Sequence, residues 1–323
     1  MEPWQRIKQL RKQGAFDQAL EEGHEFLRSD NSDFMLKSQL EWIRFDLVKK
    51  ITQEWKEHED NNRMPPADIR ERLLEQVRAY AMLKPKIPDM ASANILAKLC
   101  PIAKYLEEFP AILKWFFDQD RTGKLALPED SWKPGVWNVR VIQSTAVKVA
   151  RALAAWVKTH PETATSQTLT FALETCERIL LEAEDEDKLW LQWDLASLHR
   201  LAGNFEEAET LLKSVLKAKR SEFWVWAEAG RLYREHKPGL AKSCFCQAAR
   251  LGKDPKFLGK VHISLAELLA QQGEYGQATH EAVTAAAIYD NEGWAHPKVL
   301  ESLLVAEWYD PGLSHDAQEA FYA

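Results

Sequence analysis

Apolar side chains recur at helical spacing along almost the whole chain. In residues 33–58, Leu36, Leu40, Ile43 and Leu47 follow one another every three or four positions, which gathers them on one face of a helix. The same pattern predicts helices over 4–13, 16–28, 67–83, 90–108, 111–118, 138–158, 163–183 and 297–309. No alternation of apolar and polar residues is long enough to predict a strand, so the expected fold class is all-α.

One stretch interrupts this pattern. Residues 119–136 contain two glycines and two prolines, which makes a continuous helix through them unfavourable. The stretch predicts either a loop held by the packed side chains of Trp132 and Trp137 or a short linker. Both interpretations place an irregular region between two helical ones.

A recurring combination of small and aromatic residues marks the second half of the chain. Small residues let neighbouring helices approach closely, and aromatic residues fill the space beside them. The central copy consists of Trp226, Ala229, Gly230 and Tyr233, followed by Ala241, Phe245 and Ala248. Equivalent alanines recur on either side at Ala208 and Ala278, and an isolated copy surrounds Gly14 near the N-terminus. The motif therefore predicts a repeated structural unit.

This motif closely resembles the tetratricopeptide (TPR) repeat, whose unit is a pair of antiparallel helices of about 34 residues. The resemblance implies an α-solenoid of stacked helical hairpins with a curved, extended surface. Gly14, Gly203 and Gly273 fall where a first helix must reverse, so we expect the left-handed backbone that glycine adopts without strain. The central copy lacks such a glycine, and Pro238 is expected to begin its second helix.

The repeats divide the chain into four expected parts. Residues 1–28 form an N-terminal TPR-like hairpin, 29–185 a divergent helical region, 186–290 three tandem repeats, and 291–323 a capping helix with a tail. Whether residues 29–185 form a separate domain stays open.

Charge and hydropathy narrow the functional class. The formal net charge is −7, which argues against a broad nucleic-acid-binding surface. No apolar stretch reaches the roughly 18 residues that span a bilayer, and the N-terminus lacks the features of a signal peptide. A cytoplasmic protein without a membrane partner is therefore expected.

Sequence motifs that carry chemistry are missing. None of the phosphate-loop, dinucleotide-binding, zinc-protease or nucleophile-elbow patterns occurs, so no enzyme activity, cofactor or metal ion is expected. Cys244 and Cys246 stand too close together for an ordinary metal pair and are expected as small buried residues. His199 and His262 fall on first helices of repeats, where a structural role is favoured over a catalytic one.

Tryptophan and arginine cluster at the starts of two successive repeats. Trp226 fits ordinary packing, whereas the TPR resemblance implies that other side chains line the concave groove and bind a partner. These expected partner-binding residues are Trp190, Trp193, Arg200, Trp224, Arg231 and Arg234. Trp and Arg dominate binding hot spots, which favours an extended or helical protein segment as the ligand. Packed tryptophans and solvated arginines are the alternative.

The N-terminal copy carries a basic counterpart of this groove. The resemblance places Lys8, Arg11 and Lys12 at comparable inner positions, where they favour an acidic peptide or a negatively charged helix. An exposed, charged helix face is the alternative.

The leading hypothesis is a non-enzymatic scaffold or adaptor that binds a protein partner, through an acidic segment or one that docks on aromatic side chains. Residues 223–228 and 127–134 look similar to poorly characterised bacterial TPR proteins, which implies a multi-protein defence or stress system. The second hypothesis is a helical repeat that binds single-stranded nucleic acid, because Trp and Arg stack on unpaired bases. The acidic balance opposes nucleic acid as a partner, and self-association stays open.

Overall fold

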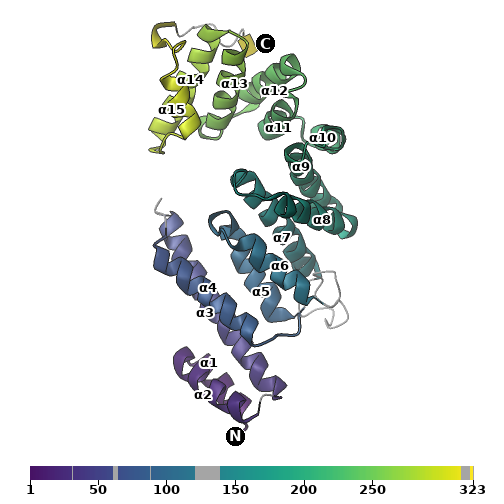
Figure 1. Ribbon diagram of the computed structural model, residues 1–323, viewed down its shortest axis with the longest axis vertical. Coiled ribbons are helices and arrows are strands. Elements are labelled where there is room, and N and C mark those ends of the chain that lie inside the picture. Colours follow the sequence, from purple (N-terminus) through teal and green to yellow (C-terminus); the bar gives the residue numbers. More distant parts are fainter. Residues whose placement is uncertain (31, 61–64, 88, 121–138, 314–320, 323) are drawn as a thin grey trace. The chain divides into compact units, whose positions relative to one another are not determined.

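All regular elements in the described part of the chain are helices (Figure 1). The computed structural model describes residues 1–323 apart from 31, 61–64, 88, 121–138, 314–320 and 323. The all-α class expected from the hydrophobic pattern is thereby confirmed. Most of the 119–136 stretch, with Trp132 and Trp137, lies outside the described residues. Among the residues that are described, no helix is both long and apolar enough to span a bilayer.

The chain forms two compact units, which we call unit 1 (Met1–Ala183) and unit 2 (Glu184–Ala323). The four-part division expected from the repeats is finer than this and stays a prediction. The elements of unit 1 are α1 (Pro3–Lys12), α2 (Phe16–Ser29), α3 (Phe34–Asp60), α4 (Ala67–Met82), α5 (Met90–Leu99), the 3-10 helix η1 (Cys100–Tyr105), α6 (Phe109–Gln119), α7 (Val139–Thr159) and α8 (Ser166–Glu182).

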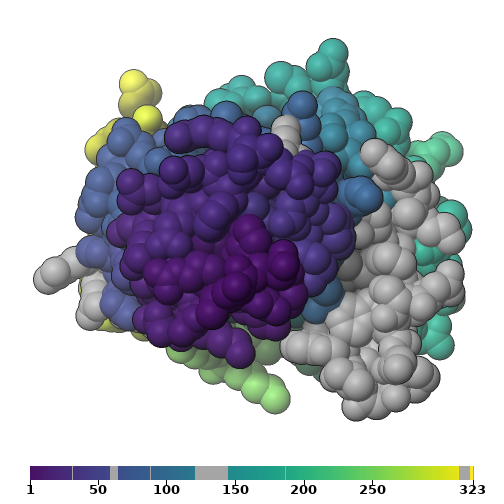
Figure 2. Space-filling view, turned by 90° about the horizontal axis from the view of Figure 1, so that it is seen from below, coloured from purple at the N-terminus to yellow at the C-terminus, as the bar shows by residue number. Residues whose placement is uncertain are grey.

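The N-terminal hairpin is fixed to the long helix α3. Helices α1 and α2 pack on each other and both contact α3. Ile7 of α1, Ala19 of α2 and Leu40 and Ile43 of α3 are fully buried where the three helices meet. Each lies on the apolar face that its helix turns toward the other two. Figure 2 looks onto this N-terminal region, drawn in purple, whose side chains form a continuous surface.

Two of the expected helices are shorter in the structure. The helix expected over 90–108 stops at Leu99 and continues as the 3-10 helix η1, because Pro101 lacks the N–H that an α-helix would need there. The C-terminal helix expected over 297–309 ends at Leu304. The expected C-terminal limits of these two helices were therefore wrong.

Unit 2 is a succession of helices in which each α-helix packs on the next. Its elements are α9 (Asp185–Leu201), α10 (Phe205–Lys219), α11 (Phe223–Tyr233), α12 (Pro238–Leu251), the 3-10 helix η3 (Pro255–Phe257), α13 (Gly259–Gln271), α14 (Tyr275–Asn291), α15 (Lys298–Leu304) and the 3-10 helix η4 (Pro311–Leu313). Helix α9 also contacts α11, so the first helices of these two successive hairpins touch directly.

The turns inside the hairpins follow the sequence expectation. Gly14, Gly203 and Gly273 have φ angles of 76°, 79° and 75°, in the left-handed region where a side chain would be strained. Pro238 begins α12 in the hairpin that lacks such a glycine. Both expectations are confirmed, because helix reversal leaves few backbone solutions.

Residues expected in the packing of unit 2 are buried or half-buried there. Trp226 lies between two apolar clusters, and its indole N–H donates to the carbonyl of Arg220 at 2.8 Å. Cys244 and Cys246 are buried, and burial raises the pKa of each thiol to about 11. The buried ring of His262 lies against a carboxylate, with Nδ1 2.6 Å from Oε2 of Glu281. Cys244, Cys246 and His262 belong to the interior, and Trp226 is half-buried at its edge.

Candidate functional site

A pocket of about 830 Å³ lies between the first helices of three successive hairpins in unit 2. We call it the arginine pocket. Its lining residues come from α9, α11 and α13 and from the start of α12: Arg200, Arg231, Arg234, Glu235, Pro238, Ser264, Leu268, Gln271 and Gln272. Because the lining is mostly cationic and amide-bearing, the pocket offers many hydrogen-bond donors and few apolar surfaces.

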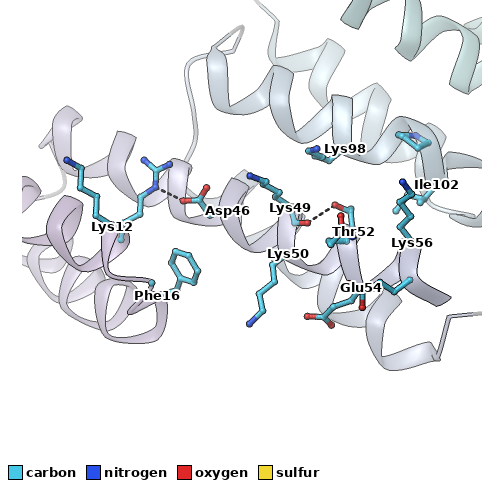
Figure 3. A pocket seen from close by; sticks show the side chains of 15 residues that line it. Lys12, Phe16, Asp46, Lys49, Lys50, Thr52, Glu54, Lys56, Lys98 and Ile102 are labelled. Atoms are coloured by element: carbon cyan, nitrogen blue, oxygen red, sulfur yellow. Dashed lines mark hydrogen bonds and ion pairs between the residues drawn. The ribbon is translucent and has the colours of Figure 1, made fainter. Parts of the chain in front are cut away.

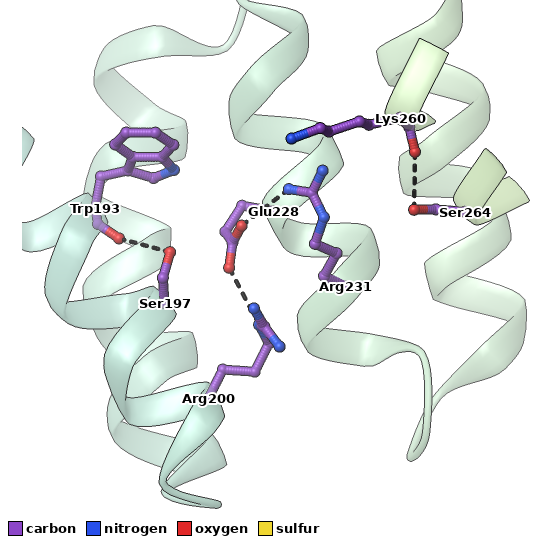
Figure 4. A network of polar contacts seen from close by, with 7 residues as sticks. All are labelled: Trp193, Ser197, Arg200, Glu228, Arg231, Lys260 and Ser264. Carbon is purple, nitrogen blue, oxygen red and sulfur yellow. Dashed lines mark hydrogen bonds and ion pairs between the residues drawn. The ribbon is translucent and has the colours of Figure 1, made fainter. Parts of the chain in front are cut away.

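Glu228 organises two of the pocket's arginines. Its side chain is only 6% exposed, and its two carboxylate oxygens bind different helices. Arg200 Nε on α9 donates to Oε1 at 3.1 Å, and Arg231 Nη1 donates to Oε2 at 3.0 Å. Figure 4 shows both guanidinium groups approaching Glu228 from opposite sides. The carboxylate therefore holds α9 and α11 in register at the pocket wall.

The third arginine, Arg234, forms an ion pair with a carboxylate of α13. Arg234 Nη1 donates to Oε2 of Glu267 on α13 at 2.8 Å, and both side chains are about a quarter exposed. A guanidinium carries five N–H donors, and each of these ion pairs uses one of them. The three arginines are thus positioned by carboxylates while most of their donors remain for a ligand.

The three tryptophans expected in the groove form a cluster of their own. Trp190 and Trp224 stack with ring centroids 5.2 Å apart, and Trp193 meets Trp224 edge to face at 5.0 Å. All three rings are half-buried, and Trp193 and Trp224 also contact the core between α9 and α11. None of the three lines the arginine pocket. Their role in partner binding stays a prediction, with much of each ring already engaged in packing.

Figure 4 also shows how the helix register relates the two groups of residues. Trp193, Ser197 and Arg200 follow one another along one face of α9, with Trp193 about two turns before the arginine. Ser197 donates its hydroxyl to the carbonyl of Trp193 at 3.2 Å, which satisfies that buried side chain within the helix. The tryptophan cluster therefore adjoins the pocket along α9 without forming part of its wall.

The basic residues expected at the N-terminus separate in unit 1. Lys8 is exposed and lies over the ring of Trp4, with Nζ 5.8 Å from the ring centroid. Arg11 is ion-paired with Asp46 on α3 at 2.6 Å and stacks on Trp42. Arg11 and Lys12 line a pocket of unit 1 whose lining does not include Lys8. Their role in partner binding stays a prediction.

Sequence reasoning missed the carboxylates that position the arginines. Glu228 and Glu267 were not singled out, although Glu228 lies three residues before Arg231, a spacing at which helical side chains meet. Ser264, Leu268 and Gln271 were missed as well, because their position at the pocket depends on how α13 packs on the preceding hairpin.

A second group of perturbed side chains lies in unit 1, where α3, α4 and α5 approach one another. The Tyr80 hydroxyl is 3.3 Å from both carboxylate oxygens of Asp89, which also caps α5 by accepting from the backbone N–H of Ser92 at 2.6 Å. Burial, assisted by the nearby Asp89 carboxylate, raises the pKa of Glu41 from 4.5 to about 7. Burial raises the pKa of Asp89 too. The capping bonds give this group a structural explanation.

Replacing Glu41 with glutamine is expected to remove a pH-dependent loss of stability. The native state holds the Glu41 proton up to about pH 7 while the unfolded chain releases it near 4.5, so the native state loses stability as pH rises between these values. At pH 8, Glu41→Gln should raise the free energy of unfolding by about 1–2 kcal/mol, after allowance for solvent screening. Urea midpoints at pH 5 and pH 8 measure this, and an equal gain at both pH values contradicts it.

Comparison with known proteins gives one family. A family model described as a domain of unknown function (DUF7017) matches residues 189–323, which is nearly all of unit 2. No curated protein matches the chain. The TPR resemblance therefore rests on the repeat motif and on the helical hairpins. Unit 2, which holds the arginine pocket, is similar to the domain that this family model describes.

Proposed function

We propose that the protein is a non-enzymatic adaptor that binds an acidic segment of a protein partner in the arginine pocket of unit 2. The observation that carries this proposal is the convergence of Arg200, Arg231 and Arg234 on one pocket of about 830 Å³. Guanidinium groups bind carboxylates through parallel hydrogen bonds, which makes arginine well suited to acidic peptide segments.

The arrangement of the helices supports a TPR-like solenoid as the scaffold. In such a solenoid, first helices of successive hairpins line the inner surface that binds the ligand. Helices α9, α11 and α13 are the first helices of three hairpins, and all three contribute to the pocket. An extended segment laid across them would meet cationic side chains first and then the amides of Gln271 and Gln272.

Single-stranded nucleic acid fits the same unit less well. Base stacking needs accessible aromatic faces, whereas Trp190 and Trp224 stack on each other with an interplanar angle of 26°. The chain's net charge of −7 also opposes a long phosphate backbone.

Neutralising two pocket arginines is expected to weaken binding of an acidic segment about tenfold or more, because two charge-assisted hydrogen-bonding groups are lost. The variant is Arg231→Gln/Arg234→Gln. The probes are a labelled oligoglutamate peptide, followed by fluorescence anisotropy, and the protein partners captured from the native host and quantified by mass spectrometry.

The matched control is Arg220→Gln/Arg250→Gln, which removes the same charge from two exposed arginines of unit 2 outside the pocket. It should retain both peptide binding and capture. Circular dichroism checks that both variants are folded. Equal weakening by the two variants, or undiminished binding by the pocket variant, contradicts the proposal, and stronger binding of a single-stranded oligonucleotide than of the peptide favours the nucleic-acid hypothesis.

A further inference from the structure

A second pocket, of about 870 Å³, lies in unit 1 between the N-terminal hairpin, the middle of α3 and the junction of α5 with η1. We call it the lysine pocket. Its charged lining residues are Arg11, Lys12, Asp46, Lys49, Lys50, Glu54, Lys56, Glu57 and Lys98. We propose that this pocket binds a compact ligand with contiguous phosphate groups, as in tripolyphosphate or a nucleoside triphosphate.

The lysines of the pocket are not neutralised by the protein. Arg11 is paired with Asp46, and Glu54 is paired with Arg72, which lies outside the pocket. Among the described residues of unit 1, no ion pair engages the remaining cations, which are Lys12, Lys49, Lys50, Lys56 and Lys98. These lysines are exposed, and those that approach one another repel, so that an anion bound among them relieves the repulsion.

The helices place three of these lysines around one space. Figure 3 shows Lys49 and Lys56 extending from α3 toward the helix that carries Lys98, whereas Lys50 extends to the other side of α3. Helix α3 packs directly on α5, so this arrangement is held by the core of unit 1. An anion bound in the space between these two helices would therefore be contacted by lysines from both of them.

Several features favour compact phosphates over an extended chain. A lysine ammonium is a point charge with three donors and binds phosphate without the planar geometry that arginine imposes. The volume falls in the range of small-molecule sites, about 300–1,000 Å³. The carboxylates Asp46, Glu54 and Glu57 stand at the same pocket and would repel a polyanion that continued past the lysines.

The pocket also offers a small apolar surface beside the charges. Phe16 from α2 and Pro101 and Ile102 from η1 line it. A nucleoside triphosphate would place its base against this surface, whereas tripolyphosphate would use the lysines alone. The shared chemistry is the row of phosphates, and the two sources differ in whether the apolar residues contribute to affinity.

The test is calorimetric titration of the full chain with sodium tripolyphosphate, with a nucleoside triphosphate, and with a single-stranded oligonucleotide of equal strand concentration. We expect both compact ligands to bind at low salt and to weaken as sodium chloride is added. Lys49→Gln/Lys98→Gln should bind tripolyphosphate about tenfold more weakly, since it removes one cation from each side of the pocket. Equal affinities for the two compact ligands identify inorganic phosphate as sufficient, and tighter nucleoside triphosphate identifies a nucleotide.

The matched control is Lys86→Gln/Lys114→Gln, which removes two exposed lysines of unit 1 that do not line the pocket. It should bind tripolyphosphate as the unaltered protein does. Absence of binding by both compact ligands overturns the proposal, as does equal weakening by the two variants or binding of the oligonucleotide alone. Because the lysine pocket lies in unit 1, these outcomes are independent of peptide binding in unit 2.

Discussion

Alanine in place of Gly230 is expected to destabilise unit 2 by about 2–3 kcal/mol, the cost of overpacking a rigid core. A Cβ at this position would lie 2.6 Å from Cε1 and 2.7 Å from Cδ1 of Phe245, well inside contact distance. The Phe245 ring is fully buried between α11 and α12 and cannot turn away without disturbing its neighbours. The measurement is the free energy of unfolding in urea, followed by circular dichroism.

Gly239 supplies the matched control on the partner helix of the same hairpin. A Cβ there would meet nothing within 4 Å, so Gly239→Ala should leave stability unchanged or slightly raised through helix propensity. A sharper check combines Gly230→Ala with Phe245→Leu, which trims the ring that the new methyl group meets. The double variant should be less destabilised than the sum of the two single variants by about 1 kcal/mol. Additive effects would mean that the two residues do not meet as described.

This contact explains why the packing inside the hairpins of unit 2 could be predicted from the repeat motif. The absence of a side chain at Gly230 leaves room for the Phe245 ring across the hairpin, so the small and the aromatic residue of the motif are complementary in shape. The left-handed turns at Gly203 and Gly273 are recognisable for the same reason, since few residues tolerate that backbone. Such local constraints are visible in a single sequence.

The arrangement of charged residues could be predicted only in part. Arg200, Arg231 and Arg234 were chosen from their repeat register, and they do line one pocket. The Arg231–Glu228 pair was derivable from its i, i+3 spacing, whereas the Arg200–Glu228 pair depends on the packing of α9 against α11. Periodicity identifies the faces of helices but not the side chains that meet between them.

The lysine pocket could not be predicted from the sequence. Lys49 and Lys56 lie on one helix, but Lys98 joins them only because α3 packs on α5. The three tryptophans were assigned to a groove from the repeat register. The contacts that Trp190 and Trp193 on α9 make with Trp224 on α11 could not be predicted, because they depend on how these two helices pack.

Replacing Glu228 with alanine is expected to lower the stability of unit 2 by about 2–3 kcal/mol. The substitution removes a buried carboxylate that bonds two arginines and leaves both without that acceptor. Removing one partner of a fully buried pair costs more, but Arg200 and Arg231 are 22% and 33% exposed and can recover part of their hydration. Glu209→Ala is the matched control, since Glu209 also meets two cations, Lys213 and Lys237, at a more exposed site. Its loss should be below about 1 kcal/mol.

The conservative variant Glu228→Gln separates the structural role of this carboxylate from its electrostatic one. Glutamine keeps the shape and one acceptor oxygen but removes the negative charge beside Arg200 and Arg231, so the pocket becomes more positive. Binding of the oligoglutamate peptide should therefore tighten severalfold while stability falls, which is the opposite of what Arg231→Gln/Arg234→Gln does to binding. Anisotropy titrations at low and high salt measure this, and the gain should shrink as salt is added. Peptide binding that weakens in Glu228→Gln, in a protein that remains folded, would mean that the carboxylate orders the arginines for the ligand more than it competes with it.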